Sequence, residues 1–204
     1  SRGMLCSANE LSIDDDASGL LELDPSLIPG TSVREALALD DTLITLKLTP
    51  NRADCLSLAG IAREVAAITG TPAHLPDVQA TPVTFNGTRA VRVEDAQACP
   101  RFVARLIDGI DAKARTPAWL KQRIERSGIR AISAVVDITN YVMLELGQPL
   151  HAYDDRLLDG DVAVRFARDG EQLTLLNGQV LDLEPGLLLV AAENDDLLWN
   201  TATE

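Results

Sequence analysis

The sequence has few aromatic residues and few cysteines, and it lacks long apolar runs. Aromatic residues make up 3% of the 204 residues, too few for a surface on which successive nucleic-acid bases stack. The cysteines Cys6, Cys55 and Cys99 are widely spaced and have no CxxC pair or histidine pair nearby, which argues against a disulfide framework and against a zinc site. No apolar run approaches the roughly 18 to 20 residues of a membrane-spanning helix. We therefore expect a soluble chain that is not bound to a membrane and has no signal peptide.

Four common functional motifs are also missing. The sequence contains no GxGxxG, GxxxxGK[ST], HExxH or GxSxG pattern. This removes the commonest dinucleotide-binding, phosphate-loop, zinc-protease and serine-hydrolase classes. Any function must be read from less common patterns.

Charge is unevenly distributed along the chain. The net charge is −13, which as a whole repels a nucleic-acid backbone. Residues 99–130, here called the basic segment, carry eight basic and three acidic residues, a net charge of +5. These positions are candidates for contact with an anionic partner, and a solvated helix face is the alternative; they include Arg115, Lys121, Arg123, Arg126 and Arg130.

The first third of the chain predicts strands and helices in alternation. Short alternating patterns predict strands at 20–23 and 41–49, with a short helix capped by Thr31 or Ser32 between them. A longer helix follows and ends at Gly70 as its C-cap. The turn and cap residues Asn51 and Asp54 precede that helix. Apolar residues recur along it at helical spacing, and they are Leu58, Ile61, Val65 and Ile68.

The second half predicts strands, two helices and further strands. Strands are expected at 89–95 and 101–110, then a helix with Thr116 at its N-cap, Pro117 at its first position and Leu120 and Ile124 facing inward. Residues 131–147 are mostly helical in period, with Val135, Ile138, Val142 and Leu146 near a spacing of 3.6 residues, although their many β-branched residues leave a strand open. Four strand-like runs follow, two of them joined by a two-residue turn at Asn177-Gly178.

These patterns predict an α+β fold in two partial modules. Residues 71–88 contain three prolines and no clear period, which is typical of a linker. The expected modules are therefore residues 1–70 and 89–204. The apolar run at 187–192 comes close to the end of the sequence and suggests a piece of something longer.

Polar residues interrupt the apolar stretch of residues 131–154. Buried polar groups must find partners or a ligand, so these residues are candidates for a binding site; they are Asp137, Asn140, Glu145, Gln148 and His151. His151 follows Pro149-Leu150, where a rigid turn can aim it. The alternative is a histidine with a purely structural role.

Two motifs carry a resemblance to a known family. LTPNRADCLSLAGIAREVAAITG (48–70) and VVDITNYVMLELGQPLHAYD (135–154) closely resemble the beta subunits of bacterial phenylalanine-tRNA ligases. The resemblance implies that residues 1–70 are part of the B1 module and residues 89–204 the front of the B3/B4 editing module. SRGMLCSANEL (1–11) resembles the end of the tRNA-binding module inserted in B1.

The family implies partners and cofactors for a larger enzyme. It is a heterotetramer of two alpha and two beta subunits, located in the cytoplasm, which uses ATP and Mg²⁺ to attach phenylalanine to tRNA(Phe). The catalytic core lies in the alpha subunit, so we expect no residue of this chain to catalyse aminoacylation. We also expect the chain to bind neither ATP nor a metal ion.

The resemblance also implies a site in this chain. In the family the histidine of GQPxHxFD lines the pocket that hydrolyses mischarged Tyr-tRNA, and His151 matches it. Asn140 falls on the same pocket-side motif, and Glu145 and Gln148 are included as candidates. Tyr153 replaces the usual phenylalanine. The basic segment is expected to contact tRNA or the alpha subunit.

One departure bears on activity. The sequence ends without the glycine-rich AGIMGG-like segment and the following glutamate and threonine that complete the family's pocket. We therefore expect these 204 residues alone neither to charge tRNA nor to edit efficiently. The alternative is a stand-alone trans-editing hydrolase, or a tRNA-binding or interaction protein related to B3/B4.

Overall fold

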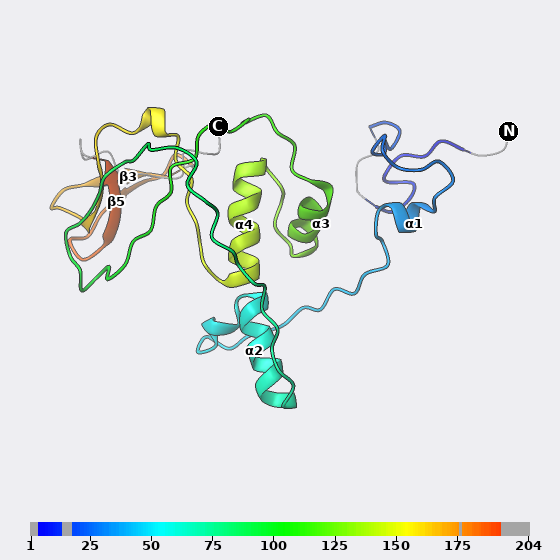
Figure 1. Ribbon diagram of the computed structural model, residues 1–204, viewed down its shortest axis with the longest axis horizontal. Coiled ribbons are helices and arrows are strands. Elements are labelled where there is room, and N and C mark those ends of the chain that lie inside the picture. The colour runs from blue at the N-terminus through cyan, green and yellow to red at the C-terminus, as the bar shows by residue number, and fades with distance from the viewer. Residues whose placement is uncertain (1–3, 14–17, 176, 193–204) are drawn as a thin grey trace. The chain divides into compact units, whose positions relative to one another are not determined.

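The computed structural model describes residues 4–13, 18–175 and 177–192, and the chain divides into two compact units, Ser1–Thr45 and Leu46–Glu204 (Figure 1). The first unit contains one short helix, α1 (Val33–Ala36), with Ser32 at its N-cap as expected. The strand expected at 20–23 is wrong, because those residues belong to no strand.

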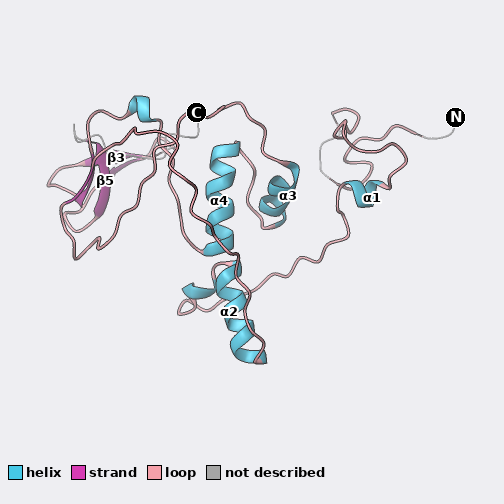
Figure 2. Ribbon diagram, viewed as in Figure 1, coloured by secondary structure: helices cyan, strands magenta, loops and turns pink. Residues whose placement is uncertain are grey.

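The second unit contains three longer helices, shown in cyan in Figure 2. They are α2 (Leu58–Thr69), α3 (Ala118–Arg126) and α4 (Ala134–Leu146). Two short 3₁₀ helices, η1 (Ala53–Cys55) and η2 (Asp155–Leu157), lie before α2 and after α4 in the chain. Both α2 and α3 pack against α4, which is therefore the central helix of this group.

Within the part of the chain that the structure describes, five strands form two small sheets. The larger sheet has the order β1 (Val91–Val93), β2 (Val162–Phe166), β5 (Leu188–Ala192). β1 and β2 are parallel, so the chain between them must cross over, and this crossover carries α3 and α4. β5 is antiparallel to β2, and β3 (Gln172–Thr174) pairs with β4 (Val180–Asp182) as a hairpin. Together with the helices, this confirms the α+β class.

Buried side chains gather in the helix pair and in the larger sheet. Leu120 and Ile124 of α3 are buried, as expected from the sequence. In the sheet the buried apolar residues come from β2 and the end of β5, and they are Val162, Ala163, Val164, Ala191 and Ala192. The strand-like runs at the end of the chain were therefore correctly predicted as sheet.

Two further predicted strands are wrong. Residues 41–49 and 101–110 belong to no strand. Their alternating pattern describes two faces of an extended segment, but a strand also needs a neighbour for its backbone hydrogen bonds. Among the described residues, neither segment has such a neighbour.

The predicted N-cap of α2 needs correction, and the apolar residues at helical spacing on α2 and α4 are not all buried. The N-cap of α2 is Ser57, whose hydroxyl accepts a hydrogen bond from the Gly60 amide at 3.1 Å, and not Asn51 or Asp54. Of the apolar residues at helical spacing on α2, Leu58, Val65 and Ile68 are exposed. On α4, Ile138 and Leu146 are exposed, while Val136 and Asp137 are buried. The helical period was correct, but the packed face was displaced from the purely apolar stripe because α4 buries a carboxylate.

Two turns also differ from expectation. Pro117 is the N-cap of α3, one position later than predicted, because the Thr116 hydroxyl donates to the Asp137 carboxylate instead of capping α3. The Leu175 amide donates to the Gln179 carbonyl at 2.8 Å, and the Gly178 amide donates to the Leu175 carbonyl at 2.8 Å, so the connection between β3 and β4 is not the predicted two-residue turn at Asn177-Gly178. Gly178 in this connection has a φ of +78°, which favours glycine.

The boundary between the two expected modules remains a prediction. Residues 71–88 contain no helix or strand, as a linker would. However, α2 belongs to the same compact unit as α3 and α4. In the described parts of the chain, no helix has the length and apolar character required to cross a membrane.

Candidate functional site

The predicted site lies at the carboxyl end of α4 and in the loop that follows. Gly147 ends α4 in the left-handed conformation with a φ of +79°. The next residues are exposed, and Gln148 donates its side-chain amide to the Pro149 carbonyl at 3.1 Å. His151 is exposed as well, and its ring stacks on Tyr153 with the ring centres 6.3 Å apart. The imidazole edge is thus accessible to a ligand.

The other two predicted residues, Asn140 and Glu145, lie on α4 and are half-buried. They are five residues apart, which places them on different faces of a helix with 3.6 residues per turn. Glu145 accepts a hydrogen bond from the Tyr141 hydroxyl at 2.8 Å. The four predicted residues therefore share one short stretch of chain, but the hydrogen bonds of the described residues do not join them into one network.

A cluster of Trp119, Arg123, Tyr141 and Glu145 joins α3 to α4 and was not predicted. Arg123 donates to the Tyr141 hydroxyl at 2.9 Å, and its guanidinium lies 5.5 Å from the Trp119 ring centre. The two aromatic rings meet edge to face at 5.4 Å. Burial, with a contribution from Glu145, raises the pKa of the Tyr141 phenol.

Spacing in the sequence would have found this cluster. Trp119 and Arg123 are four residues apart in one helix, and so are Tyr141 and Glu145 in the next. The chain has only seven aromatic residues, so two of them at this spacing from charged residues form a specific signal.

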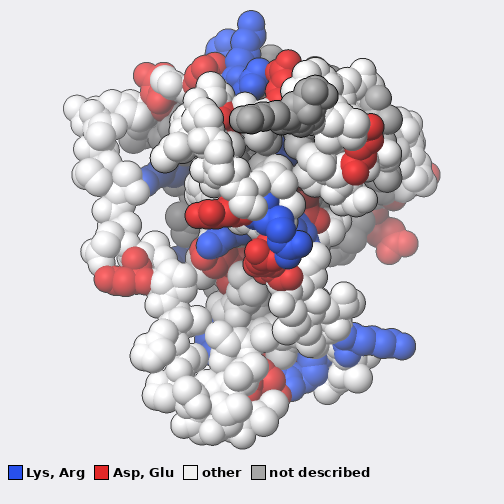
Figure 3. Space-filling model, turned by 90° about the vertical axis from the view of Figure 1, so that its right-hand side faces the viewer, with Lys and Arg blue, Asp and Glu red and all other residues white. Residues whose placement is uncertain are grey.

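The basic segment has charges in different surroundings. Arg115 and Arg130 are exposed, whereas Lys121 pairs with Glu125 at 3.7 Å and Arg123 belongs to the α3–α4 cluster. Arg126 is half-buried. On the face drawn in Figure 3, basic and acidic groups are interspersed. Arg115 and Arg130 are therefore the best placed of these residues to meet an anionic partner.

Asp137 has a structural role. It is fully buried, and its carboxylate accepts hydrogen bonds from the Thr116 hydroxyl and, at 2.9 Å, from the Ile132 amide. These bonds tie the segments before α3 and before α4 to the first turn of α4. The sequence indicated that this polar residue needed partners, and the chain itself supplies them.

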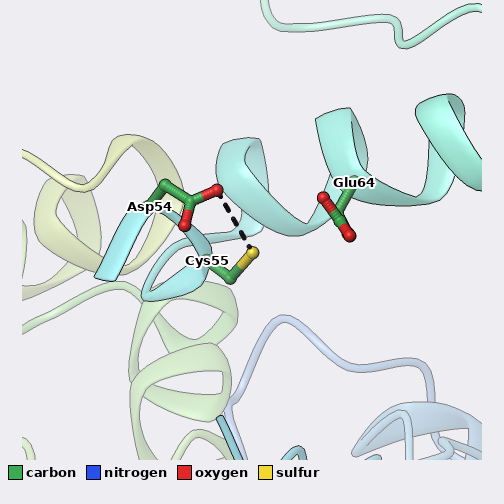
Figure 4. A group of neighbouring side chains, drawn as sticks. All are labelled: Asp54, Cys55 and Glu64. Atoms are coloured by element: carbon green, nitrogen blue, oxygen red, sulfur yellow. Dashed lines mark hydrogen bonds between the residues drawn. The ribbon is translucent and has the colours of Figure 1, made fainter. Parts of the chain in front are cut away.

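A second polar cluster lies beside α2. The ligand atoms of Asp54, Cys55 and Glu64 lie within 4.8 Å of one another (Figure 4). The Arg52 guanidinium donates to both carboxylates, at 2.9 Å to Asp54 Oδ2 and 2.6 Å to Glu64 Oε2. Hydrogen bonding to Arg52 lowers the pKa of both carboxyl groups, and burial raises the pKa of the Cys55 thiol. Arg52 supplies the positive charge that a cation would bring, so this is an ion-pair cluster.

The Arg52 cluster borders a shallow groove of about 370 Å³ against α2. Its apolar wall includes Leu46, Leu48, Ile61 and Val65. None of the predicted site residues lines this groove.

Comparison with known proteins covers nearly the whole chain. The B3/4 domain family matches residues 98–201. The chain belongs to the B3/4 domain family. This B3/4 region contains all four predicted site residues, the α3–α4 cluster and the whole basic segment. The resemblance found in the sequence motifs is thereby confirmed.

Individual relatives extend the match beyond the B3/4 region. The chain is 55% identical to the phenylalanine-tRNA ligase beta subunits of Bordetella pertussis, over 192 residues, and Aromatoleum aromaticum, over 191 residues. It is 52% identical to that of Neisseria meningitidis serogroup A over 198 residues. These alignments cover 94% to 97% of this chain but only 24% to 25% of the relatives. The chain thus spans about a quarter of the length of the curated relatives it matches.

Proposed function

We propose that this chain is part of the beta subunit of a phenylalanine-tRNA ligase and that its B3/4 region frames the site that hydrolyses Tyr-tRNA. The observation that carries the proposal is the exposed position of His151, within the matched region and directly after α4. The 55% identity to named beta subunits over most of the chain supports the same assignment.

The physical need for such a site is clear. A synthetic pocket that accepts phenylalanine cannot strongly reject an isostere that only adds a hydroxyl group. A second site that hydrogen-bonds this hydroxyl selects tyrosine, because phenylalanine would leave its buried polar groups unpaired. His151 then positions the ester or its attacking water, with Asn140 on the adjoining helix and Gln148 in the same loop. Glu145 acts through Tyr141, whose hydroxyl it holds.

The proposal includes partners outside the chain. They are an alpha subunit in an alpha₂beta₂ heterotetramer and tRNA(Phe), in the cytoplasm. ATP and Mg²⁺ serve the whole enzyme at another site. The Asp54–Cys55–Glu64 group does not fit Mg²⁺, because a thiol is a soft ligand and Arg52 occupies both carboxylates.

The test replaces His151 in the full ligase. His151→Ala is expected to slow hydrolysis of Tyr-tRNA by about 10²-fold, the contribution typical of a positioned proton-transfer group, while charging with phenylalanine continues. The matched control is His74→Ala, at the chain's other histidine, which is exposed at residue 74 in the expected linker. Wild-type clearance of Tyr-tRNA by His151→Ala would refute the assignment.

The same assay separates the two function classes. The 204 residues alone are expected to leave Tyr-tRNA intact, because the chain spans only about a quarter of the length of the beta subunits it matches. Robust turnover by this chain alone would instead favour a stand-alone editing hydrolase.

The basic segment is included in the proposal as a tRNA contact. Arg115 and Arg130 are exposed on either side of α3 in the chain, and Lys121, Arg123 and Arg126 lie on α3 between them. Phosphate contacts are sensitive to salt, which provides a test at the scale of the whole molecule.

A further inference from the structure

The amino end of α2 meets the carboxyl end of α4 at Ser57 and Gly147. A Cβ atom added to Gly147 would lie 3.1 Å from Ser57 Oγ and 3.3 Å from Ser57 Cβ. Ser57 is itself buried and held, since its hydroxyl caps α2 by accepting from the Gly60 amide. The partial positive charge at the start of one helix also faces the partial negative charge at the end of the other. The contact is therefore close and electrostatically favourable.

The α2 side of this contact is rigid. A Cβ atom at Gly60 would lie 1.8 Å from the Asp54 carbonyl oxygen, so η1 packs directly on the first turn of α2. Arg52 links Asp54 at η1 to Glu64 in the second turn of α2. Cys55 and Ala59 are both buried between these segments. Motion of the Ser57 side chain would require this packed corner to move.

The α4 side of the contact leads directly to His151. Three residues separate Gly147 from His151, and one of them is Pro149, whose ring fixes its φ. A chain segment this short transmits a displacement of its first residue to its last. We propose that Ser57 is a positioning residue for His151, setting the place of residues 148–151 through its contact with Gly147. The proposal rests on the function proposed above.

The test is Gly147→Ala in the full ligase, with Gly70→Ala as the matched control. Both glycines end helices in the left-handed conformation, with φ of +79° and +71°, but nothing lies within 4 Å of a Cβ at Gly70. Both variants therefore introduce similar backbone strain, and only Gly147→Ala presses on Ser57. We expect kcat for Tyr-tRNA hydrolysis to fall by about 10- to 100-fold in Gly147→Ala, the loss typical of a misplaced reacting group. Gly70→Ala should stay within about twofold of wild type, since surface changes away from a site have small effects.

A second variant separates positioning from a general loss of structure. Ser57→Gly removes the atoms that an alanine at 147 would meet, and glycine is tolerated at an N-cap with little loss. The double variant Ser57→Gly/Gly147→Ala is therefore expected to recover most of the lost kcat. Charging with phenylalanine, measured on each preparation, reports assembly of the ligase. Equal hydrolysis by Gly147→Ala and Gly70→Ala, or a double variant no faster than Gly147→Ala, would overturn the proposal.

His151→Ala, measured in parallel, distinguishes this inference from the proposed function. If His151→Ala clears Tyr-tRNA at the wild-type rate, the proposed function fails and this inference fails with it. If His151→Ala is impaired but Gly147→Ala behaves as Gly70→Ala does, only the positioning role of Ser57 is wrong.

Discussion

Arg165 is the most deeply buried basic side chain in the described part of the chain, with 2% of its surface exposed in β2. Two hydrogen bonds to the Glu171 carboxylate, at 2.6 and 3.0 Å, compensate this charge. The hydrogen bonds from Arg165 hold the pKa of Glu171 at about 2, below its usual 4.5. The ionised pair is therefore part of the folded state at neutral pH.

Replacing Glu171 should lower the stability of the fold, because the buried Arg165 charge depends on this carboxylate. Glu171→Gln removes the negative charge that accepts two hydrogen bonds from the buried Arg165 guanidinium, so we expect the free energy of unfolding to fall by about 3 kcal/mol at pH 7. A depressed carboxyl pKa stabilises the fold above the unfolded value and loses this effect as pH falls through the folded value. Wild-type stability should thus decline between pH 4.5 and about 2, and Glu171→Gln should flatten this decline. Urea unfolding across this pH range is the measurement.

Glu184→Gln is the control for Glu171→Gln, because Glu184 is exposed near the same strands. Its unfolding free energy should change by less than about 0.5 kcal/mol. A similar loss in both variants would show that the Arg165 pair is not what stabilises this region.

Helix α3 is fixed to α4 by a few buried side chains. Ile124 is fully buried at this contact. Ile124→Ala would leave a cavity between the two helices, and we expect a loss of about 2 to 5 kcal/mol in the free energy of unfolding. Ile138→Ala on α4 is the control, because Ile138 is 51% exposed and should change stability little. Equal unfolding midpoints in urea for the two variants would contradict this packing.

The ends of helices were predicted correctly where a residue in the local sequence determines them. The helices that became α2 and α4 end at Gly70 and Gly147, where a left-handed residue stops a helix regardless of the rest of the fold. The alternating run at 41–49 failed as a strand because strand formation depends on a neighbour that sequence periodicity does not describe.

In the candidate site, too, features set by the local sequence were predicted, and contacts set by tertiary packing were not. His151 was predicted in a rigid turn and lies in an exposed loop, because Gly147 and Pro149 fix the local backbone. The Tyr141–Glu145 hydrogen bond and the Ser57–Gly147 contact were not predicted. Aromatic and charged residues at i and i+4 could have indicated the Tyr141–Glu145 hydrogen bond. The Ser57–Gly147 contact depends on how two helices pack and has no signal along the chain.

At the scale of the whole molecule, charge restricts where tRNA can approach. The chain has a net charge of −13, so most of its surface repels a phosphate backbone. The proposed tRNA contact is therefore expected in the basic segment, whose net charge is +5. Of its candidate contact residues, Lys121 pairs with Glu125 and Arg123 with Tyr141, whereas Arg115 and Arg130 are exposed.

The salt dependence of tRNA binding tests this restriction. Each phosphate that a cation neutralises adds roughly 0.7 to 0.9 to the slope of log affinity against log salt concentration. Replacing both Arg115 and Arg130 by Gln in the full ligase should therefore lower the magnitude of that slope by about 1.5. Arg63→Gln, at an exposed arginine of α2 outside the basic segment, should leave the slope unchanged. An unchanged slope in the double variant would place these arginines against the alpha subunit or in solvent, because a residue that neutralises no phosphate releases no counterion from tRNA.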